Sequence, residues 1–402
     1  MINLDIFIGK YVTKREHSMF EADIEENRVQ LSEKIAGKSV LVIGGAGSIG
    51  SSFIKAMLPF EPASLVVVDV NENGLAELTR DLRSTKGMYV PEDYVPYPMN
   101  FASPVFEKMF RNRGGFDIVA NFSAHKHVRS EKDIYSVEAL LQNNVLQAKK
   151  LLDLLVEIPP EEYFCVSTDK AANPVNIMGA SKRIMEDVIF AYSDKFPVKT
   201  ARFANVAFSN GSLPAGFIAR LQKLQPISAP SDVKRYFVSP EESGQICMLA
   251  CMLGANREIF FPRLEEAQMM TFDKIATAFL KVHGYDVLEC ASDAEAIERV
   301  AELRNGSKKY PVHYSSSNTS GEKAYEEFYT ESETVDFDRL QALGVVTGKQ
   351  IPDVSRVEAL FEKLNAVFAK EDTTKEEVVE IMADYLPNFE HIETGKSLDS
   401  KM

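Results

Sequence analysis

Residues 166–183, VSTDKAANPVNIMGASKR, bring side chains that can exchange protons close together along the chain. Asp169 and Lys170 are adjacent, and Lys182 follows in a stretch that is typical of a helix. Met178 stands four residues before Lys182, so the two share one face of that helix, but a thioether cannot transfer a proton. Proton transfer in this segment must therefore use its other polar groups or water. Alternatively, Asp169 and Lys170 form a surface ion pair, the usual role of such neighbours.

A glycine-rich turn, GGAGSIG, stands between an apolar strand and an amphipathic helix. Gly44, Gly47 and Gly50 have the spacing G-x-x-G-x-x-G. Backbone amides at a helix N-terminus attract a diphosphate, and glycines let it approach closely. We therefore predict that this turn, with Ser48 and Ile49 inside it, binds the diphosphate of a dinucleotide.

An acid and an amide follow the next two predicted strands. Asp69 lies nineteen residues after Gly50, at the end of LVVVD. A carboxylate there can accept both adenosine ribose hydroxyls and repel a 2'-phosphate, so we expect NAD rather than NADP. Alternatively, Asp69 caps a helix or lies in a solvated turn. Asn100, after the third strand, either hydrogen-bonds the adenine edge or holds a turn.

The stretch NFSAHKHV ends the fourth predicted strand. We expect Ala124 to face the nicotinamide, and Lys126 and His127, on the loop that follows, to contact substrate. The alternatives are a charged surface turn and, for His127, a structural histidine. No His, Cys and carboxylate cluster has metal-ligand spacing, so we expect no metal.

Composition bounds the function. The 402 residues are 45% hydrophobic, which is enough to bury a sizeable core. The formal charge of -14 disfavours binding to nucleic acid or an anionic membrane, which needs clustered Lys and Arg. The four cysteines form no C-x-x-C pair and are expected to be reduced core thiols. We find neither a signal peptide nor a membrane-span pattern, so we expect a cytoplasmic protein.

The elements that must position these residues alternate between strands and helices. Short apolar runs, SVLVIGG, SLVVVDV, FDIVANFSA, YFCVSTD and TARFANVAF, are separated by helical stretches. This pattern predicts a Rossmann-like α/β fold, a doubly wound parallel sheet covered on both faces.

We divide the chain into four parts. These are an N-terminal helical arm (1–37), an NAD-binding Rossmann domain (38–225) to which later segments can return, a smaller α/β substrate-binding region (226–345) and a C-terminal helical extension (346–402). Candidate capping boxes at Ser355–Glu358 and Thr373–Glu376 mark helix starts in the extension.

From about Lys38 to Glu327 the chain resembles the nucleotide-sugar 4,6-dehydratases of the extended short-chain dehydrogenase/reductase superfamily, in the polysaccharide-biosynthesis branch acting on UDP-N-acetylglucosamine. The matching stretches are GGAGSIG, HKHV, STDKAANPVNIMGASKR, RFANV, KRYFVSPEE and GEKAYEE. The superfamily commonly carries Tyr-x-x-x-Lys on its catalytic helix. One group of this branch has Met at the Tyr position, and Met178 resembles that group, so the replacement is compatible with an active enzyme.

The resemblance implies a reaction without net redox change. Hydride passes from C4 of the sugar to NAD and returns to C6, after a base has taken the C5 proton and water has left from C6. Thr168 is then placed near the C4 hydroxyl, Asp169 is the acid, Lys170 is the base, and Lys182 holds the nicotinamide ribose. Met178 serves core packing.

The base needs a special environment. Lysine has a reference pKa of about 10.4, so Lys170 is a poor base unless burial and positive charge from Lys182 and NAD lower its pKa. The adjacent Asp169 would raise that pKa if both residues were ionised. We therefore treat Asp169 and Lys170 as a coupled pair.

For the substrate, the resemblance implies Arg235, with Lys234 as a further candidate, at the diphosphate. Asn205 binds the sugar or diphosphate, or satisfies backbone groups instead. Glu322, in GEK, lies near the nucleotide or caps a helix. Ala204 departs from the glycine usual in the family, so UDP- and GDP-linked sugars both stay open.

We therefore expect an NAD-dependent 4,6-dehydratase of a nucleotide-linked N-acetylhexosamine, acting as a homo-oligomer. The enzymatic alternative is a 4-epimerase or 4-oxidase on the same scaffold, which leaves the C6 oxygen in place. A catalytically silent NAD-binding scaffold is the alternative from another class. Met178 and the terminal extensions favour it, and the retained Thr168, Asp169 and Lys170 argue against it.

Overall fold

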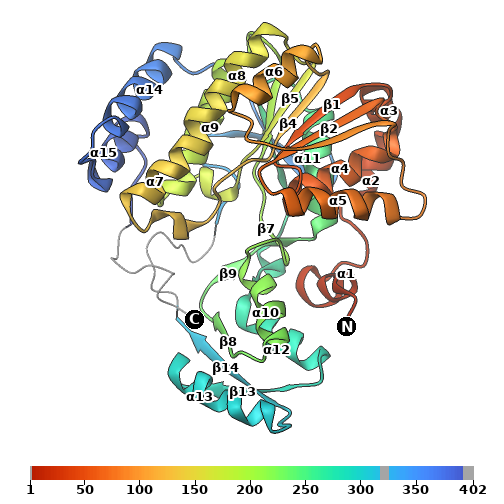
Figure 1. Ribbon diagram of the computed structural model, residues 1–402, viewed down its shortest axis with the longest axis vertical. Helices are drawn as coiled ribbons and strands as arrows, with labels where there is room; N and C mark the ends of the chain where they lie inside the picture. The colour runs from red at the N-terminus through yellow and green to blue at the C-terminus, as the bar shows by residue number, and fades with distance from the viewer. Residues whose placement is uncertain (1, 317–325, 393–402) are drawn as a thin grey trace.

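The computed structural model describes residues 2–316 and 326–392 (Figure 1). A large layered unit lies above a smaller one, and the chain passes between them more than once (Figure 1). A pair of helices near the C-terminus flanks the large unit.

The large unit is built on a sheet that has nine strands among the described residues. In order across the sheet they are β15 (Thr334–Asp336), β16 (Leu343–Thr347), β11 (Glu258–Pro262), β6 (Val198–Ala201), β5 (Glu162–Val166), β4 (Ile118–Asn121), β1 (Ser39–Ile43), β2 (Ser64–Asp69) and β3 (Asp93–Pro98). Neighbours from β3 to β11 pair in parallel, whereas β16 and β15 add antiparallel strands. The predicted Rossmann-like α/β fold is confirmed.

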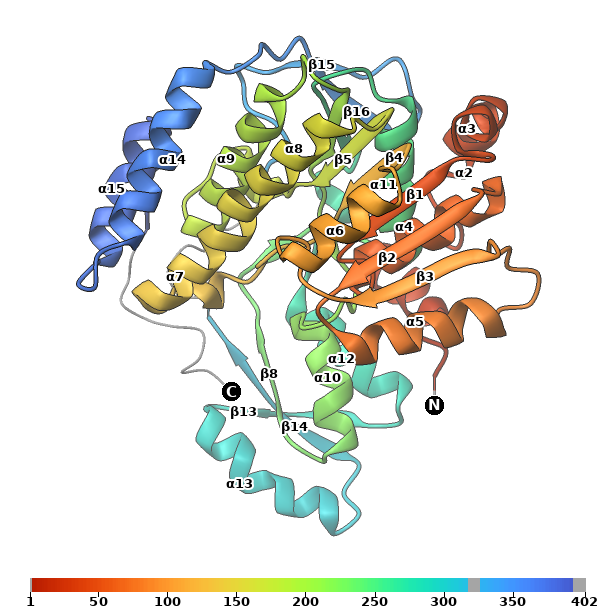
Figure 2. The ribbon, with the colours of Figure 1, turned by 45° about the horizontal axis from the view of Figure 1, so that its top comes forward.

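The central strands are apolar along their length because helices cover both faces of the sheet. Every residue of β5 is buried. On one face α4 (Ser48–Met57) packs against α11 (Pro240–Leu253), and α8 (Gln147–Glu157) and α9 (Ile177–Ala191) cover the other (Figure 2). The other helices of this unit are α2 (Glu21–Glu26), α3 (Arg28–Ile35), α5 (Glu72–Ser84), α6 (Pro104–Asn112) and α7 (Ile134–Leu141).

The strand order reverses beside β1. Val42 of β1 lies opposite Val67 of β2 on one side and Ala120 of β4 on the other. The chain therefore runs outward from β1 to β3 and returns to the opposite side of β1, which leaves a crevice at the carboxyl ends of β1 and β4. Ligands of open α/β sheets bind in such crevices, and the glycine-rich turn directly follows β1.

The smaller unit has its own parallel sheet, in the order β13 (Asp286–Cys290), β14 (Lys309–Ser315) and β8 (Ile227–Pro230). Its helices are α10 (Leu213–Gln222), α12 (Phe272–Val282) and α13 (Asp293–Arg304). Phe217, Phe279 and Tyr310 belong to its hydrophobic core, which is distinct from that of the large unit.

Two short strand pairs lie where the chain passes between the units (Figure 1). They are β7 (Asn205–Val206) with β10 (Phe237–Val238), and β9 (Lys234–Arg235) with β12 (Met270–Thr271). These pairs fix Asn205 and Arg235 at the junction.

The N-terminal arm is shared between the two units. α1 (Leu4–Phe7) and the helical segment Ile8–Thr13 contribute to the core of the smaller unit, whereas α3 packs on that of the large unit. Between them, Arg15 donates two hydrogen bonds of 2.7 Å to the Glu242 carboxylate on α11. The arm is therefore integrated into the fold.

The predicted substrate-binding region, 226–345, contributes strands and helices to both units. α11, β11, β15 and β16 belong to the layers of the large sheet, because β11 pairs with the edge of β6 and β16 pairs with β11. α10 (Leu213–Gln222), which precedes residue 226, already belongs to the smaller unit, and the chain later returns to the large unit at α11.

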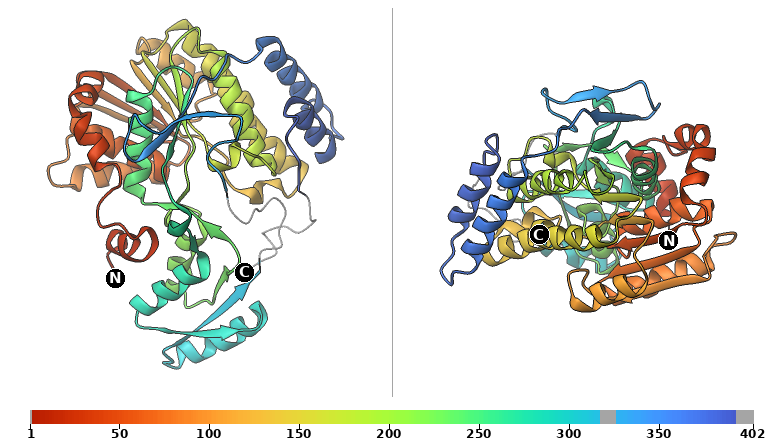
Figure 3. Two further views of the ribbon diagram at one scale, coloured as in Figure 1. Left: turned by 180° about the vertical axis from the view of Figure 1, so that it is seen from behind. Right: turned by 90° about the horizontal axis from the view of Figure 1, so that it is seen from above.

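The C-terminal extension forms α14 (Val354–Phe368) and α15 (Lys375–Tyr385), which pack together on the outside of α9 (Figure 3). The predicted helix starts are wrong by one or two residues. Asp353 caps α14, and the capping box of α15 is Thr374 with Glu377. In the part of the chain that the structure describes, no helix has the length and hydrophobicity to cross a membrane.

Candidate active site

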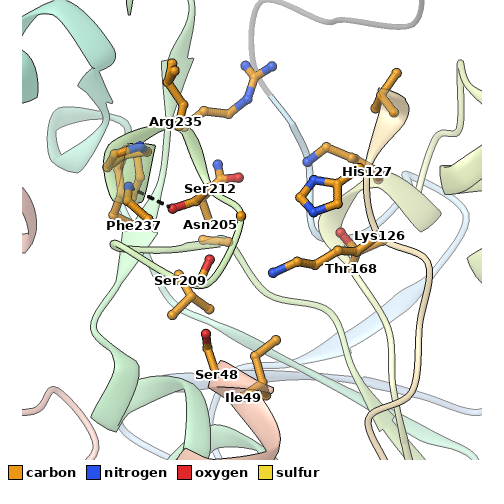
Figure 4. A pocket seen from close by; sticks show the side chains of 18 of the residues that line it. Ser48, Ile49, Lys126, His127, Thr168, Asn205, Ser209, Ser212, Arg235 and Phe237 are labelled. Carbon is orange, nitrogen blue, oxygen red and sulfur yellow. Dashed lines mark hydrogen bonds between the residues drawn. The ribbon is translucent and has the colours of Figure 1, made fainter. Parts of the chain in front are cut away.

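A cavity of about 1080 Å³ opens between the carboxyl ends of the large sheet's strands and the smaller unit (Figure 4). Most of the residues predicted for cofactor and substrate line it: Gly44, Gly47, Ser48, Ile49, Gly50, Ala124, Lys126, His127, Thr168, Asp169, Lys170, Lys182, Asn205 and Arg235. Asp69 and Asn100 lie outside this lining, and Glu322 lies outside the described residues. Residues far apart in the sequence thus meet at the predicted crevice.

The glycine-rich turn packs too closely for side chains. Gly44 has a φ of +74°, and a Cβ there would lie 2.7 Å from the backbone of Phe122 after β4. A Cβ at Gly50 would lie 2.4 Å from the Gly44 carbonyl oxygen. The N-terminus of α4, with Ser48 and Ile49, is therefore open to the cavity (Figure 4). This cradle fits the diphosphate of NAD.

Asp69 and Asn100 both hold turns beside this cradle. The Asp69 carboxylate accepts the Ala46 amide at 3.0 Å and the Asn71 amide at 2.9 Å. It therefore lies against the glycine-rich turn, next to the predicted diphosphate site. Asn100 Oδ1 accepts the Ala102 amide at 2.7 Å. The contacts of Asp69 with ribose and of Asn100 with adenine stay predictions.

The acid and base candidates follow β5 in a short helical turn. Asp169 Oδ1 accepts three hydrogen bonds, from Thr168 Oγ1 at 2.9 Å, the Lys170 amide at 2.9 Å and Lys170 Nζ at 3.0 Å. Asp169 is 3% exposed, and all three residues line the cavity. Asp169 is therefore buried and Lys170 partly buried, and the pair lines the cavity, unlike the surface ion pair of the alternative interpretation.

A second carboxylate, which sequence reasoning missed, also contacts Lys170. Glu326 Oε1 lies 3.8 Å from Lys170 Nζ, and Glu326 lines the cavity. Burial would lower the pKa of Lys170, but Asp169 and Glu326 outweigh it and raise that pKa above its ordinary value, against the opposing effect of Arg235. The condition set for a good base, a pKa lowered by burial and positive charge, is thus not met, and the raising effect expected of Asp169 prevails together with that of Glu326.

α9 presents Met178 and Lys182 to the cavity. Lys182 Nζ donates to the Val166 carbonyl of β5 at 2.9 Å, and burial lowers the pKa of Lys182. Met178 is 3% exposed, and its backbone amide donates to Glu131 Oε1 at 2.9 Å. Met178 is therefore a packed apolar part of the cavity wall.

A loop from the junction closes over the start of α4. The Asn210 amide donates to Ser48 Oγ at 2.8 Å, and the Asn210 carbonyl accepts from Lys126 Nζ at 2.9 Å. Gly211 has a φ of +75°, and a Cβ there would lie 2.9 Å from His127 Nε2. Lys126 is exposed, but partial desolvation of its ammonium group by the surrounding residues lowers its pKa. Lys126 and His127 thus contact this loop at Asn210 and Gly211.

Asn205 and Arg235 reach the cavity from the short strand pairs. Arg235 is buried and donates to the Lys234 carbonyl at 2.9 Å. Asn205 Nδ2 is buried and has no hydrogen-bond partner among the residues that the structure describes. A donor of this kind in a cavity wall is suited to a ligand oxygen. The exposed Lys234 side chain lies outside the lining, so Arg235 is the better placed cation.

Arg202 and the four cysteines are buried within the fold. Arg202, at the end of β6, is buried and pairs with Glu186 at 2.6 Å and Glu333 at 2.8 Å. The four cysteines are buried and free. Across residues 2–316 and 326–392, no group of His, Cys, Asp or Glu side chains is arranged to hold a metal ion.

The sequence matches a family model described as polysaccharide biosynthesis protein over residues 40–343. A protein of Methanocaldococcus jannaschii described as an uncharacterized membrane protein is 28% identical over 86% of this chain and 96% of its own length. The capsular polysaccharide biosynthesis protein CapD of Staphylococcus aureus is 26% identical over 76% of this chain, which spans 50% of CapD. The UDP-N-acetylglucosamine 4,6-dehydratase (inverting) of Campylobacter jejuni is 24% identical over 74% of this chain and 84% of its own.

Solved structures share the fold. Pen from Bacillus thuringiensis has a TM-score of 0.61 at 19% identity, covering 79% of this chain and 90% of its own. DesIV, a dTDP-glucose 4,6-dehydratase from Streptomyces venezuelae solved with NAD and TYD bound, has a TM-score of 0.52 at 21% identity. The match covers 61% of this chain and 81% of DesIV. A UDP-N-acetylglucosamine 4-epimerase from Methanobrevibacter ruminantium has a TM-score of 0.53 at 15% identity, and the match covers 83% of this chain and 99% of the epimerase. At these identities the likeness concerns the fold alone.

Proposed function

We propose that this chain, which belongs to the polysaccharide biosynthesis protein family, catalyses the NAD-dependent 4,6-dehydration of a nucleotide-linked N-acetylhexosamine. UDP-N-acetylglucosamine is the first candidate, and a GDP-linked sugar is the second. The product would be a 4-keto-6-deoxy sugar for surface polysaccharide or glycoconjugate biosynthesis.

One observation carries the proposal. Asp169 and Lys170, at the end of β5, line the same cavity as Lys182 and the glycine-rich cradle at Ser48. A 4,6-dehydration needs an acid and a base at neighbouring carbons of one sugar, and adjacent Asp and Lys side chains supply both. A 4-epimerase does not need this second acid–base pair.

Residues of the cavity wall would hold the cofactor. When bound, NAD would accept hydride from C4 of the sugar and return it to C6. The amides of Ser48 and Ile49 are suited to its diphosphate, Asp69 to the adenosine ribose, and Lys182 to the nicotinamide ribose. DesIV, which was solved with NAD bound, supports this choice of cofactor.

The proton chemistry falls to three adjacent residues. Thr168 Oγ1 contacts Asp169 Oδ1 at 2.9 Å, so a proton from the C4 hydroxyl has a path through Thr168 to the Asp169 carboxylate. Asp169, protonated in this way, is the acid that helps the C6 oxygen leave as water. Lys170 takes the C5 proton. Met178 takes no part in these steps. Thr168, Asp169 and Lys170 carry the proton transfer that a tyrosine at position 178 of α9 would otherwise provide.

The proposed substrate contacts come from the short strand pairs between the two units. Arg235 is the cation placed for the diphosphate, and the buried amide of Asn205 is a donor for a sugar or phosphate oxygen. Lys126 and His127 would contact the same ligand from the loop after β4. The activity of the Campylobacter jejuni relative supports a UDP-linked N-acetylhexosamine.

The test is incubation of the purified protein with a panel of UDP- and GDP-linked sugars, followed by mass spectrometry and NMR. We expect loss of one water, no accumulation of free NADH, and transfer of deuterium from C4 to C6. A C4 epimer that retains its C6 oxygen would show a 4-epimerase, and stoichiometric NADH release would show a 4-oxidase. Complete absence of turnover with bound NAD would identify a silent scaffold.

A further inference from the structure

The ammonium group of Lys170 is held by two carboxylates from distant parts of the chain. Asp169 Oδ1 lies 3.0 Å and Glu326 Oε1 3.8 Å from Lys170 Nζ. The Glu326 side chain is 4% exposed and lines the same cavity. Thr168, Asp169, Lys170 and Glu326 therefore form one chain of polar contacts along the cavity wall.

This arrangement poses a problem for the proposed base. An ammonium group paired with two carboxylates is held in its charged form, and a charged lysine cannot accept the C5 proton. Met178 cannot take up a proton either. Lys170 must therefore pass its own proton to a neighbour before it acts.

The two carboxylates differ in their suitability for that proton. Asp169 Oδ1 already accepts three hydrogen bonds, and the proposed mechanism uses Asp169 for the proton of the C4 hydroxyl. Glu326 contacts the same ammonium group and has no other task in the reaction.

We propose that Glu326 is the proton acceptor for Lys170, an inference that rests on the proposed dehydration. A proton moves from Lys170 Nζ to Glu326 Oε1, which leaves a neutral amine and a neutral carboxylic acid. The amine then takes the C5 proton, while Asp169 gives the former C4 hydroxyl proton to the departing C6 oxygen. When C6 receives hydride, Lys170 returns a proton to C5 and recovers its own from Glu326. The residues end in their starting state, with one water released.

A purely electrostatic role for Glu326 predicts the opposite effect of mutation. Removing one carboxylate beside Lys170 would lower the lysine pKa and make its amine easier to form, so Glu326→Gln would exchange the C5 proton as fast as the parent or faster. As a proton acceptor, Glu326 is required, and its loss should slow exchange and product formation by roughly 100-fold, within the usual range for general acid–base groups.

The test compares Glu326→Gln, Glu326→Asp and Glu327→Gln. Glu327 is exposed and contacts Asn173 at 2.8 Å, so it is a matched neighbouring control expected to keep parental activity. C5 exchange in deuterated water and product formation are measured, with NAD binding and thermal unfolding recorded for each variant. We expect Glu326→Gln to bind NAD normally and lose exchange, and Glu326→Asp to keep part of it.

The outcomes separate this inference from the proposed function. If the parent dehydrates its sugar and Glu326→Gln exchanges C5 within about threefold of the parent, Glu326 is not the acceptor and the dehydratase stands. If the parent neither dehydrates nor exchanges C5 in any sugar, both proposals fall. If Glu326→Gln does not fold, Glu326→Asp is the deciding variant, because its shorter carboxylate keeps the charge but lies farther from Lys170 Nζ. C5 exchange in Glu326→Asp as fast as in the parent would then overturn the inference.

Discussion

Lys170 Nζ lies 3.0 Å from Asp169 Oδ1, so the proposed base and the proposed acid are partners in one ion pair. A change to either side chain therefore alters the surroundings of the other. Both residues belong to the turn after β5, whereas the predicted diphosphate site is the turn after β1, so proton transfer and diphosphate binding are assigned to different segments of the cavity wall.

Lys170→Met tests the base. We expect dehydration to fall by at least about 100-fold, because general base catalysis typically contributes that much, while NAD binding stays close to that of the parent. Product formation and C5 exchange are followed by NMR, and cofactor binding by calorimetry. A Lys170→Met protein that turns over like the parent would show that another group takes the C5 proton.

Met178→Leu tests whether the residue in the tyrosine position has a chemical role. The two side chains have similar volumes, so we expect most of the activity to be retained and stability to change by less than about 1.5 kcal/mol. Kinetics and thermal unfolding measure the two effects. Loss of activity in a folded, NAD-bound Met178→Leu protein would contradict a role in packing alone.

Local patterns in the sequence were sufficient for the fold and for most of the cavity. The glycine-rich turn follows an apolar strand and opens a helix, and these neighbours along the chain determine where Gly44 and Ser48 lie. Asp169 and Lys170 follow β5 directly, so the strand end carries them to the crevice. Such positions depend on local periodicity, which a single sequence contains.

Contacts between distant segments could not be predicted in the same way. Glu326 meets Lys170 only after the chain has passed through the smaller unit, and Asn210 meets Ser48 across the junction. No spacing rule connects either pair. Even the start of α15 was misplaced, because the adjacent Thr373 and Thr374 both suit a helix cap, and Thr373 instead donates to the Val367 carbonyl of α14.

Asp69 tests the choice of cofactor. Its carboxylate lies against the glycine-rich turn, and we expect it to repel a 2'-phosphate, so the parent should bind NAD at least about tenfold more tightly than NADP. Asp69→Asn removes the charge and keeps one side-chain carbonyl oxygen, so the affinity for NAD should exceed that for NADP by a smaller factor than in the parent. Calorimetry with both cofactors measures it, with Asp81→Asn on α5 as a control that keeps the parental ratio. Equal affinity of the parent for NAD and NADP would contradict the assignment.

Glu333 tests the pH dependence of stability. Burial would raise its pKa, but Arg202 and Lys349 outweigh burial and lower the pKa to about 2. A carboxyl whose pKa is lowered on folding stabilises the protein above its ordinary pKa of about 4.5, and that stabilisation is lost as pH falls toward 2.

Glu333→Gln should therefore be less stable than the parent at pH 7 by about 3 kcal/mol, because the buried Arg202 loses one partner. The variant should also lose less stability than the parent when the pH is lowered. Urea unfolding at several pH values between 7 and 3 measures both effects. The exposed neighbour Glu331, changed to Gln, is the control and should follow the parent. Parallel acid profiles for parent and Glu333→Gln would rule out this linkage.

Phe7 joins the N-terminal arm to the loop that closes over α4. Its ring packs edge-on against Phe208, with 5.7 Å between centroids, and against Phe279, with 5.9 Å. Phe208 has a φ of +55°, a strained conformation for a residue with a side chain, which the surrounding packing must maintain. Asn210, which contacts both Ser48 and Lys126, lies two residues further along the chain.

Phe7→Ala should consequently destabilise the smaller unit by about 3 kcal/mol or more, because it leaves a cavity in a packed aromatic core. It should also weaken protection of the Asn210 amide against hydrogen exchange, since the loop loses its support. Ile6 is 68% exposed whereas Phe7 is 2% exposed, so Ile6→Ala is a control of adjacent position that should change stability by less than about 0.5 kcal/mol. Urea unfolding and hydrogen exchange across residues 207–212 measure the two effects. If Phe7→Ala and Ile6→Ala behave alike in both measurements, the N-terminal arm does not support the loop.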